Sequence, residues 1–289
     1  MTLVGVGLLG GSLGLAVKQR RLANAVVGYV RRRSSVAECK RFGAVDSATL
    51  DLREAVCGAD LIVLCTPIAQ MRSLVAEMMP AIQPGTIITD VGSVKASIVT
   101  ELEPLAARVG VHFVGSHPMA GAEKTGVAAA RADLFRKAVC VITPTAKSDT
   151  AAVRQVEQLW KRVGSRILRL SPKAHDELVS RSSHLPHVVA AGVANLVLAP
   201  DFPPEQGALC ANGFRDSTRI AASSPEMWRD ISLANRKNLD AALASLIEKL
   251  GDFRRALRKA DAQAISRFFE TAKQRRDLWA VGKGSTSPE

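Results

Sequence analysis

The sequence predicts an α/β domain followed by an all-helical domain. Up to roughly residue 170, short apolar or β-branched runs alternate with helix-like stretches, the pattern of a parallel sheet covered by helices. After Ser171 and Pro172 the strand signals stop and long helical patterns take over. A length of 289 residues and a hydrophobic content of 47% supply enough apolar material for two domains.

The predicted boundaries follow these changes of pattern. We expect a first domain over residues 1–171, a helical domain over 172–281 and a disordered tail, rich in Gly and Ser, over 282–289. Amphipathic helical segments such as Met71–Met79 and Val153–Val163 separate the predicted strands. These strands are Thr2–Val6, Ala25–Val30, Leu61–Cys65, Thr86–Asp90, His112–Gly115, Ala138–Thr143 and Arg166–Arg169.

Two apolar patterns mark the helical domain. The run Val188–Ala199 is interrupted by Asn195 and is shorter than the roughly 20 residues that span a bilayer, so it predicts a buried helix and no membrane segment. Within 233–257 the apolar residues follow helical spacing and form one stripe, which fits either an intrachain core or a dimer interface. The stripe consists of Leu239, Leu243, Leu246, Leu250, Phe253 and Leu257.

Composition narrows the location and the partners. Five widely spaced cysteines without a C-x-x-C pair predict free thiols, and with no export signal visible we expect a cytoplasmic protein. A net charge of +12 fits an anionic small substrate or simple solubility. Because only 4% of the residues are aromatic, nucleic acid is not an expected partner.

A glycine-rich turn follows the first predicted strand. Gly5-Val6-Gly7-Leu8-Leu9-Gly10 matches G-x-G-x-x-G and precedes a helix predicted to open at Gly11–Ser12. In a Rossmann-type fold the first glycine permits a tight turn, the second admits a pyrophosphate and the third lets helix and strand pack closely. The residues predicted to bind a dinucleotide here are Gly5, Gly7, Leu8, Leu9 and Gly10, joined by Thr66 and Pro67 after the strand Leu61–Cys65.

An arginine run follows the second strand, where NAD-preferring sites carry an acidic residue. The side chains of Arg31, Arg32, Arg33 and Ser34 suit a 2′-phosphate, since guanidinium groups bind phosphate oxygens in bidentate fashion. We therefore expect NADP as the preferred cofactor and NAD as the alternative. An exposed arginine run can also be an ordinary solvated loop.

Further polar segments lie beyond the ends of predicted strands and in the helical domain. They include Asp90-Val91-Gly92-Ser93-Val94-Lys95, Gly115-Ser116-His117-Pro118-Met119-Ala120-Gly121, Ser183-His184-Leu185-Pro186-His187 and Phe214-Arg215-Asp216-Ser217-Thr218-Arg219-Ile220. Together with the glycine motif, over nearly the whole chain, the sequence resembles the prephenate/arogenate dehydrogenases of tyrosine biosynthesis. The resemblance implies a Rossmann domain followed by a helical domain that forms a homodimer.

The resemblance also implies a reaction. Hydride leaves ring carbon 4 of prephenate for the nicotinamide, the 4-hydroxyl loses its proton, and the ring carboxylate departs as carbon dioxide. Such chemistry needs a base, carboxylate anchors and an oriented nicotinamide, and it needs no metal.

The resemblance assigns roles to individual residues. His117 matches the base and Ser93 the serine that hydrogen-bonds the same hydroxyl beside the nicotinamide, although Ser93 could also cap a helix over Val94–Thr100. Arg219 matches a carboxylate anchor, with a surface salt bridge as the alternative. The remaining substrate-binding candidates are His184 and His187, of which we favour His187, and Glu123 and Asp216, which match an ionic network at the pocket entrance.

The sequence leaves alternatives open for the substrate and for the class of protein. Within the family that the sequence resembles, the second histidine of H-L-P-H and the Glu-Lys pair after H-P-M-A-G are typical of prephenate enzymes, whereas NADP use is typical of arogenate enzymes. A β-hydroxyacid dehydrogenase would require a catalytic lysine motif that does not stand out. A non-catalytic NADP(H)-sensing protein would not need His117, Ser93 and Arg219, which are all present.

Overall fold

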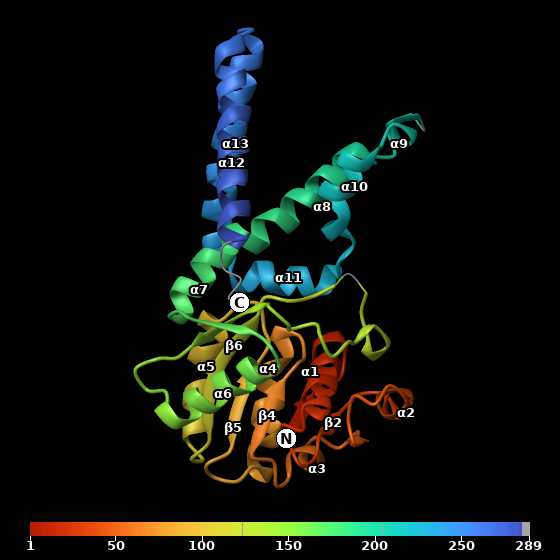
Figure 1. Cartoon of the computed structure of the whole chain (residues 1–289), viewed down its shortest axis with the longest axis vertical. Coiled ribbons are helices and arrows are strands. Elements are labelled where there is room, and N and C mark those ends of the chain that lie inside the picture. The colour runs from red at the N-terminus through yellow and green to blue at the C-terminus, as the bar shows by residue number, and fades with distance from the viewer. Residues whose placement is uncertain (123, 204, 285–289) are drawn as a thin grey trace. The chain divides into compact units, whose positions relative to one another are not determined.

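The computed structural model describes residues 1–122, 124–203 and 205–284. The chain forms two compact units, one over Met1–Asn238 and one from Leu239 onward. The first unit contains the whole sheet and the first helices of the helical region (Figure 1).

The first unit is built on a sheet of eight strands in the order β3-β2-β1-β4-β5-β6-β7-β8. Chain order reverses between β1 and β4, and in open α/β sheets such a switch point is where ligands bind. The strands are β1 (Thr2–Val4), β2 (Val27–Tyr29), β3 (Ser47–Thr49), β4 (Leu61–Leu64), β5 (Ile87–Asp90), β6 (His112–Pro118), β7 (Val139–Thr143) and β8 (Arg166–Arg169).

Helices cover both faces of this sheet, because successive strand residues alternate between them. Leu3 packs with α1, α2 and α6 on one face, while its neighbour Val4 packs with α3, α4 and α5 on the other. The helices of this region are α1 (Leu8–Gln19), α2 (Arg33–Arg41), α3 (Leu52–Val56), α4 (Ile68–Met78), η1 (Met79–Ala81), α5 (Ala96–Ala107), η2 (Val127–Ala129) and α6 (Thr150–Arg162).

The predicted parallel sheet is wrong at one pairing. Strands β6 and β7 are antiparallel, with Ser116 opposite Ile142. A parallel pairing needs a long crossover, usually helical, whereas η2 is the only helix assigned among the described residues between these strands.

Several boundaries also differ from the prediction. Helix α1 begins at Leu8, three residues earlier than expected, and Ser47–Thr49 is a strand that the sequence did not indicate. The predicted Ser93 cap is wrong, since α5 begins at Ala96 with Lys95 at its N-cap position. The side chain of Asp176 caps this helix instead, because it accepts the backbone N–H groups of Lys95 and Ala96.

Helices after the sheet continue the first unit. They are α7 (Pro172–Val179), the π-helical turn η3 (Ser180–His184), α8 (Leu185–Val197), α9 (Glu205–Ala208), α10 (Asn212–Thr218), η4 (Arg219–Ala222) and α11 (Pro225–Ala234). Helix α7 packs on α5 and β7, and α11 packs on α4. The predicted domain boundary at residues 171/172 coincides with the start of α7, although α7 belongs to the same compact unit as the sheet.

Helix α8 is not the buried helix that its apolar run predicted. Ala190 is its one buried residue, while Leu196 and the following Leu198 are 67% and 54% exposed. The described residues of this chain do not cover the apolar surface, which explains the failure of the prediction. Among the described residues, no helix combines the length and apolar character required to cross a bilayer.

The second unit is a helical hairpin of α12 (Arg236–Arg258), most of which lies beyond Asn238, and α13 (Ala262–Gly284). Phe253 of α12 packs on Phe268 and Phe269 of α13, with ring centroids 4.7 and 5.6 Å apart. The predicted stripe is only partly covered, because Leu250 and Leu257 remain 51% and 53% exposed. Of the predicted tail, 282–284 belong to α13 and residues 285–289 lie outside the described part.

The packing of α1 on the sheet generates a stability prediction. A Cβ at Gly10 would stand 2.1 Å from the Gly5 carbonyl oxygen, so Gly10→Ala should destabilise the protein by about 1–3 kcal/mol. Thermal unfolding followed by circular dichroism measures the loss. Gly7→Ala is the matched control, since its Cβ would have no neighbour within 4 Å. Equal melting temperatures of the two variants would contradict this packing.

Candidate functional site

The glycine turn between β1 and α1 has the shape that a dinucleotide requires. Gly5 has a φ of +96°, and a Cβ there would lie 2.9 Å from the Thr66 methyl carbon after β4. Gly10 packs against Gly5, whereas the space beside Gly7 is open. Gly7, at the N-terminus of α1, can therefore admit a pyrophosphate to the unpaired backbone N–H groups of Leu8 and Leu9.

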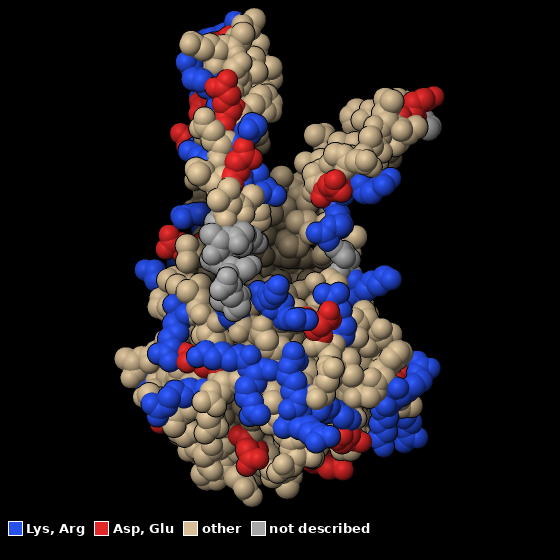
Figure 2. Space-filling view, in the orientation of Figure 1, with Lys and Arg blue, Asp and Glu red and all other residues tan. Residues whose placement is uncertain are grey.

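The arginine run lies at the next strand end along the sheet. Arg31, Arg32, Arg33 and Ser34 are all exposed, and α2 starts at Arg33 with no acidic residue in its first turn. Figure 2 shows basic side chains gathered over α2 at the right of the view. The arrangement suits a phosphate group, because the helix N-terminus and the guanidinium groups both favour negative charge.

His117 is the second-last residue of β6, directly before Pro118, and is 7% exposed. Its Nδ1 is 2.8 Å from Nε2 of His175, and the two rings meet edge to face. Ser93 is half-buried in the loop after β5, the strand beside β6. The carboxyl ends of β1, β4, β5 and β6 lie along one edge of the sheet because these strands are parallel.

His175 and Asp176 complete this cluster, although the sequence analysis did not select them. His175 is fully buried on the first turn of α7, and its Nδ1 is 2.8 Å from Oδ1 of Asp176. The same carboxylate accepts the backbone N–H groups of Lys95 and Ala96, at 2.7 and 2.9 Å, and so caps α5. Adjacent helical residues point about 100° apart, so neither periodicity nor spacing marks them as a pair.

A buried ion pair lies behind the histidines. Lys95 and Asp90 are both fully buried and form a direct ion pair, and Asp90 also accepts the backbone N–H groups of Gly92 and Ser116. Burial lowers the pKa of Lys95, and the Asp90 carboxylate opposes that shift. The pair lies between the end of β5 and the start of α5, with Lys95 near enough to act on His117.

The electrostatic surroundings favour a neutral His117. Burial lowers the pKa of His117 well below its ordinary value of 6.5, and the nearby His175, Lys95 and His184 lower it further. A neutral imidazole has one nitrogen that can accept a proton. Because Nδ1 of His117 already faces His175, Nε2 is the nitrogen left for a substrate.

His184 is fully buried at the end of η3. The side-chain amide nitrogen of Asn235 lies 3.2 Å from His184 Nδ1 and also donates to the Asp176 carbonyl oxygen at 2.8 Å. Burial lowers the pKa of His184 to about 4. Asn235 therefore ties α7 and η3 to the end of α11, and His184 is a neutral side chain in this contact.

His187 is more open and is only half-buried on α8. Its ring stacks on Trp228 of α11, with centroids 3.8 Å apart, and its Nδ1 donates to the Ser183 carbonyl oxygen at 2.9 Å. Burial lowers the pKa of His187. The contact of Trp228 with His187 could not be anticipated from the spacing of these residues in the sequence.

The other candidates lie farther along the helical region. Arg219 is exposed at the start of η4, which packs on the helix α8 that carries His187. Asp216 is exposed on α10. Glu123 lies outside the described residues.

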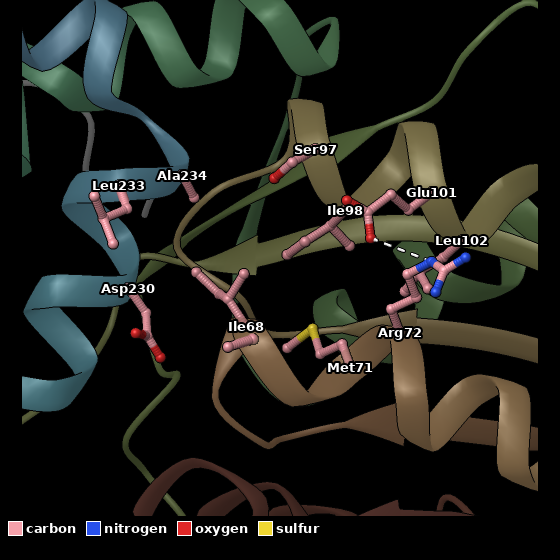
Figure 3. A pocket seen from close by; sticks show the side chains of 11 residues that line it. Ile68, Met71, Arg72, Ser97, Ile98, Glu101, Leu102, Asp230, Leu233 and Ala234 are labelled. Atoms are coloured by element: carbon pink, nitrogen blue, oxygen red, sulfur yellow. Dashed lines mark ion pairs between the residues drawn. The ribbon is translucent and has the colours of Figure 1, made fainter.

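A separate cavity of about 430 Å³ lies between α4, α5 and α11 (Figure 3). Ile68 and Met71 of α4 face Ile98 of α5 across it, and an ion pair between Arg72 and Glu101 stands at one side. None of the predicted site residues is among the described residues that line this cavity. It is therefore distinct from the histidine cluster.

The sheet order and the glycine turn define a dinucleotide-binding protein whose polar cluster joins the sheet to the first helices of the helical region. Residues 13–169 match the family model described as the prephenate dehydrogenase nucleotide-binding domain. Residues 171–273 match the prephenate dehydrogenase dimerization domain. The chain therefore belongs to the prephenate dehydrogenase family.

Individual relatives cover nearly the whole chain. Prephenate dehydrogenase of Bacillus subtilis is 36% identical over 95% of this chain and 74% of its own length. The Aquifex aeolicus prephenate dehydrogenase in complex with hydroxyphenyl propionate and NAD+ aligns with a TM-score of 0.88 and 29% identity, covering 96% and 97% of the two chains. Arogenate dehydrogenase of Synechocystis aligns with a TM-score of 0.80 and 28% identity, covering 96% and 99%.

The open space at Gly7 predicts a specific binding defect. Gly7→Ala should leave the melting temperature unchanged but weaken NAD(P) binding about tenfold or more, because the new methyl group would occupy the space of the pyrophosphate. Fluorescence titration with reduced cofactor measures the Kd. Unchanged affinity would contradict the placement of the pyrophosphate at this turn.

Proposed function

We propose that this chain catalyses the NAD(P)-dependent oxidative decarboxylation of prephenate to 4-hydroxyphenylpyruvate in tyrosine biosynthesis. The observation that carries the proposal is His117, a buried histidine of depressed pKa whose Nδ1 is occupied by another histidine. An enzyme that removes one hydroxyl proton requires such a neutral, oriented base. Membership of the prephenate dehydrogenase family agrees with this role.

In the proposed mechanism, His117 accepts the 4-hydroxyl proton of the substrate on Nε2. Ser93 hydrogen-bonds the same hydroxyl group, and Arg219 binds a substrate carboxylate, where its planar guanidinium provides orientation as well as charge. A nicotinamide dinucleotide held at the turn of Gly5, Gly7 and Gly10 would supply the hydride acceptor. Loss of carbon dioxide then gives an aromatic ring, which supplies the driving force.

The two histidines of the S-H-L-P-H segment have different proposed roles. His187 is the better substrate contact because it is half-buried, and Trp228 fixes the plane of its ring. His184 is fully buried against Asn235, and we assign it a structural role. On the family resemblance alone, we propose that Asp216 and Glu123 take part in an ionic network that acts on substrate binding.

The cofactor site includes Thr66, Pro67 and Ser93 besides the glycine turn, and we propose NADP as the preferred cofactor. The support is the exposed run Arg31–Arg33 at the N-terminus of α2, where no carboxylate competes for the ribose. The proposed substrate is prephenate, with arogenate as the alternative. Two carboxylates suit the basic character of the protein, which has a net charge of +12.

We propose a homodimer formed through the helical region. Large apolar side chains of the second unit remain exposed, among them Ile247, Leu278 and Val281, which are 66–73% exposed. Residues 171–273 match a dimerization domain, and a second copy of the chain would cover such surfaces. The five free cysteines support the expected cytoplasmic location.

The reaction is tested by mixing the protein with prephenate or arogenate and with NADP or NAD, and following the absorbance of reduced cofactor. We expect the highest kcat/KM with prephenate and NADP. His117→Asn should lower kcat by about 10²–10⁴-fold without preventing cofactor binding, since it removes the base. Absence of turnover in all four mixtures, with cofactor binding intact, would overturn the proposed function.

A further inference from the structure

A hydrogen-bonded chain of three side chains runs from the sheet into the helical region. It leads from His117 on β6 through His175 on α7 to Asp176, the residue that caps α5. All three side chains are buried: His117 is 7%, His175 0% and Asp176 2% exposed. Neither His175 nor Asp176 has a place in the mechanism proposed above.

The direction of each hydrogen bond follows from the carboxylate. Asp176 accepts two backbone N–H groups of the α5 N-terminus, so its oxygens face donors, and the hydrogen on the His175 ring lies on Nδ1. In neutral His175 the other nitrogen, Nε2, is then an acceptor. His117 must therefore donate its Nδ1–H to Nε2 of His175. The lone pair of the neutral His117 ring is then on its Nε2.

We propose that His175 and Asp176 are positioning residues that hold His117 in the tautomer with hydrogen on Nδ1, so that Nε2 can accept the substrate proton. This inference rests on the proposed function in taking His117 as the base. Once Nε2 has taken the proton, the imidazolium still donates from Nδ1 to His175. The Asp176 carboxylate, two rings away, stabilises the added charge.

The surroundings of the chain agree with this role. Charged and titratable groups face it from neighbouring elements: Lys95 and Asp90 from the β5–α5 segment and His184 from η3. Burial lowers the pKa of His175, and its hydrogen bond to Asp176 opposes that shift. Because desolvation disfavours charge on both rings, each histidine has a single acceptor nitrogen, and the Asp176 carboxylate determines which one.

The inference is tested without turnover by ¹⁵N NMR of histidine-labelled protein. The chain has five histidines, and the signals missing from His117→Asn assign His117. We expect a protonated, pyrrole-like Nδ1 and a pyridine-like Nε2 for His117 in the ligand-free enzyme. The opposite pattern in the wild-type protein would overturn the inference even if the enzyme turns over prephenate.

Two variants test the effect on catalysis. His175→Phe keeps an aromatic ring but removes the acceptor, so kcat should fall about a hundredfold, with KM and cofactor Kd changed less than about threefold. The His117 tautomers should then become mixed. His175→Gln can present an amide oxygen to His117 Nδ1 and should recover about tenfold of the lost kcat.

Val179→Ala is the matched control, since Val179 is buried on the same helix, about one turn from His175, and lies outside the hydrogen-bonded chain. It should lower the melting temperature while leaving kcat and the His117 tautomer unchanged. If His175→Phe retains wild-type kcat and tautomer, or if Val179→Ala loses kcat equally, His175 has only a structural role. A wild-type protein that turns over neither prephenate nor arogenate would overturn the proposed function, and the tautomer measurement would still decide this inference.

Discussion

The carboxylate of Asp176 is the contact on which the arrangement of the candidate site depends. It caps α5 through the backbone N–H groups of Lys95 and Ala96 and binds the ring of His175 at the same time. Burial of a carboxylate costs free energy unless its oxygens are hydrogen-bonded. The three hydrogen bonds offset that desolvation cost for Asp176. The same contact fixes α7 on the sheet, and with it the position of the His117 partner.

The site consequently lies where the sheet meets the first helices that follow it. Strand β5 and the loop after it supply Asp90, Ser93 and Lys95, and β6 supplies His117. The helices beyond the sheet supply His175 and the histidines of η3 and α8. The cofactor turn depends on a different constraint, the absence of side chains at Gly5 and Gly10. Both features lie at carboxyl ends of parallel strands, which is where an open α/β sheet exposes backbone and side chains to ligands.

Local patterns were sufficient for much of this architecture. Seven of the eight strands overlap predicted strands, because most of them are continuous apolar runs, and the predicted range Arg166–Arg169 agrees with β8 at both ends. The short strand Ser47–Thr49 was missed since it has no apolar run, and the antiparallel β6–β7 pairing depends on the connection rather than on the strands. The prediction that α8 is buried is wrong, because the sequence does not reveal whether an apolar face is covered by its own chain.

Some candidate residues could be predicted from the sequence and others could not. His117, Ser93, Arg219 and the glycine turn belong to contiguous motifs that a resemblance could identify. His175, Asp176 and Asn235 gain their roles from contacts between segments at least 50 residues apart, the shortest being 51 residues between Asn235 and His184. Tertiary packing, which a single sequence does not display, creates those contacts.

The account depends most on a neutral His117 at working pH, and the pH dependence of kcat/KM tests this directly, since it reports the free enzyme. Because the pKa of His117 is lowered, its ring stays neutral at a lower pH than an ordinary histidine does. The acid limb should therefore fall below pH 6.5, the ordinary value for histidine. An acid limb at or above pH 6.5 would contradict the account, because His117 would then be a charged side chain in the free enzyme.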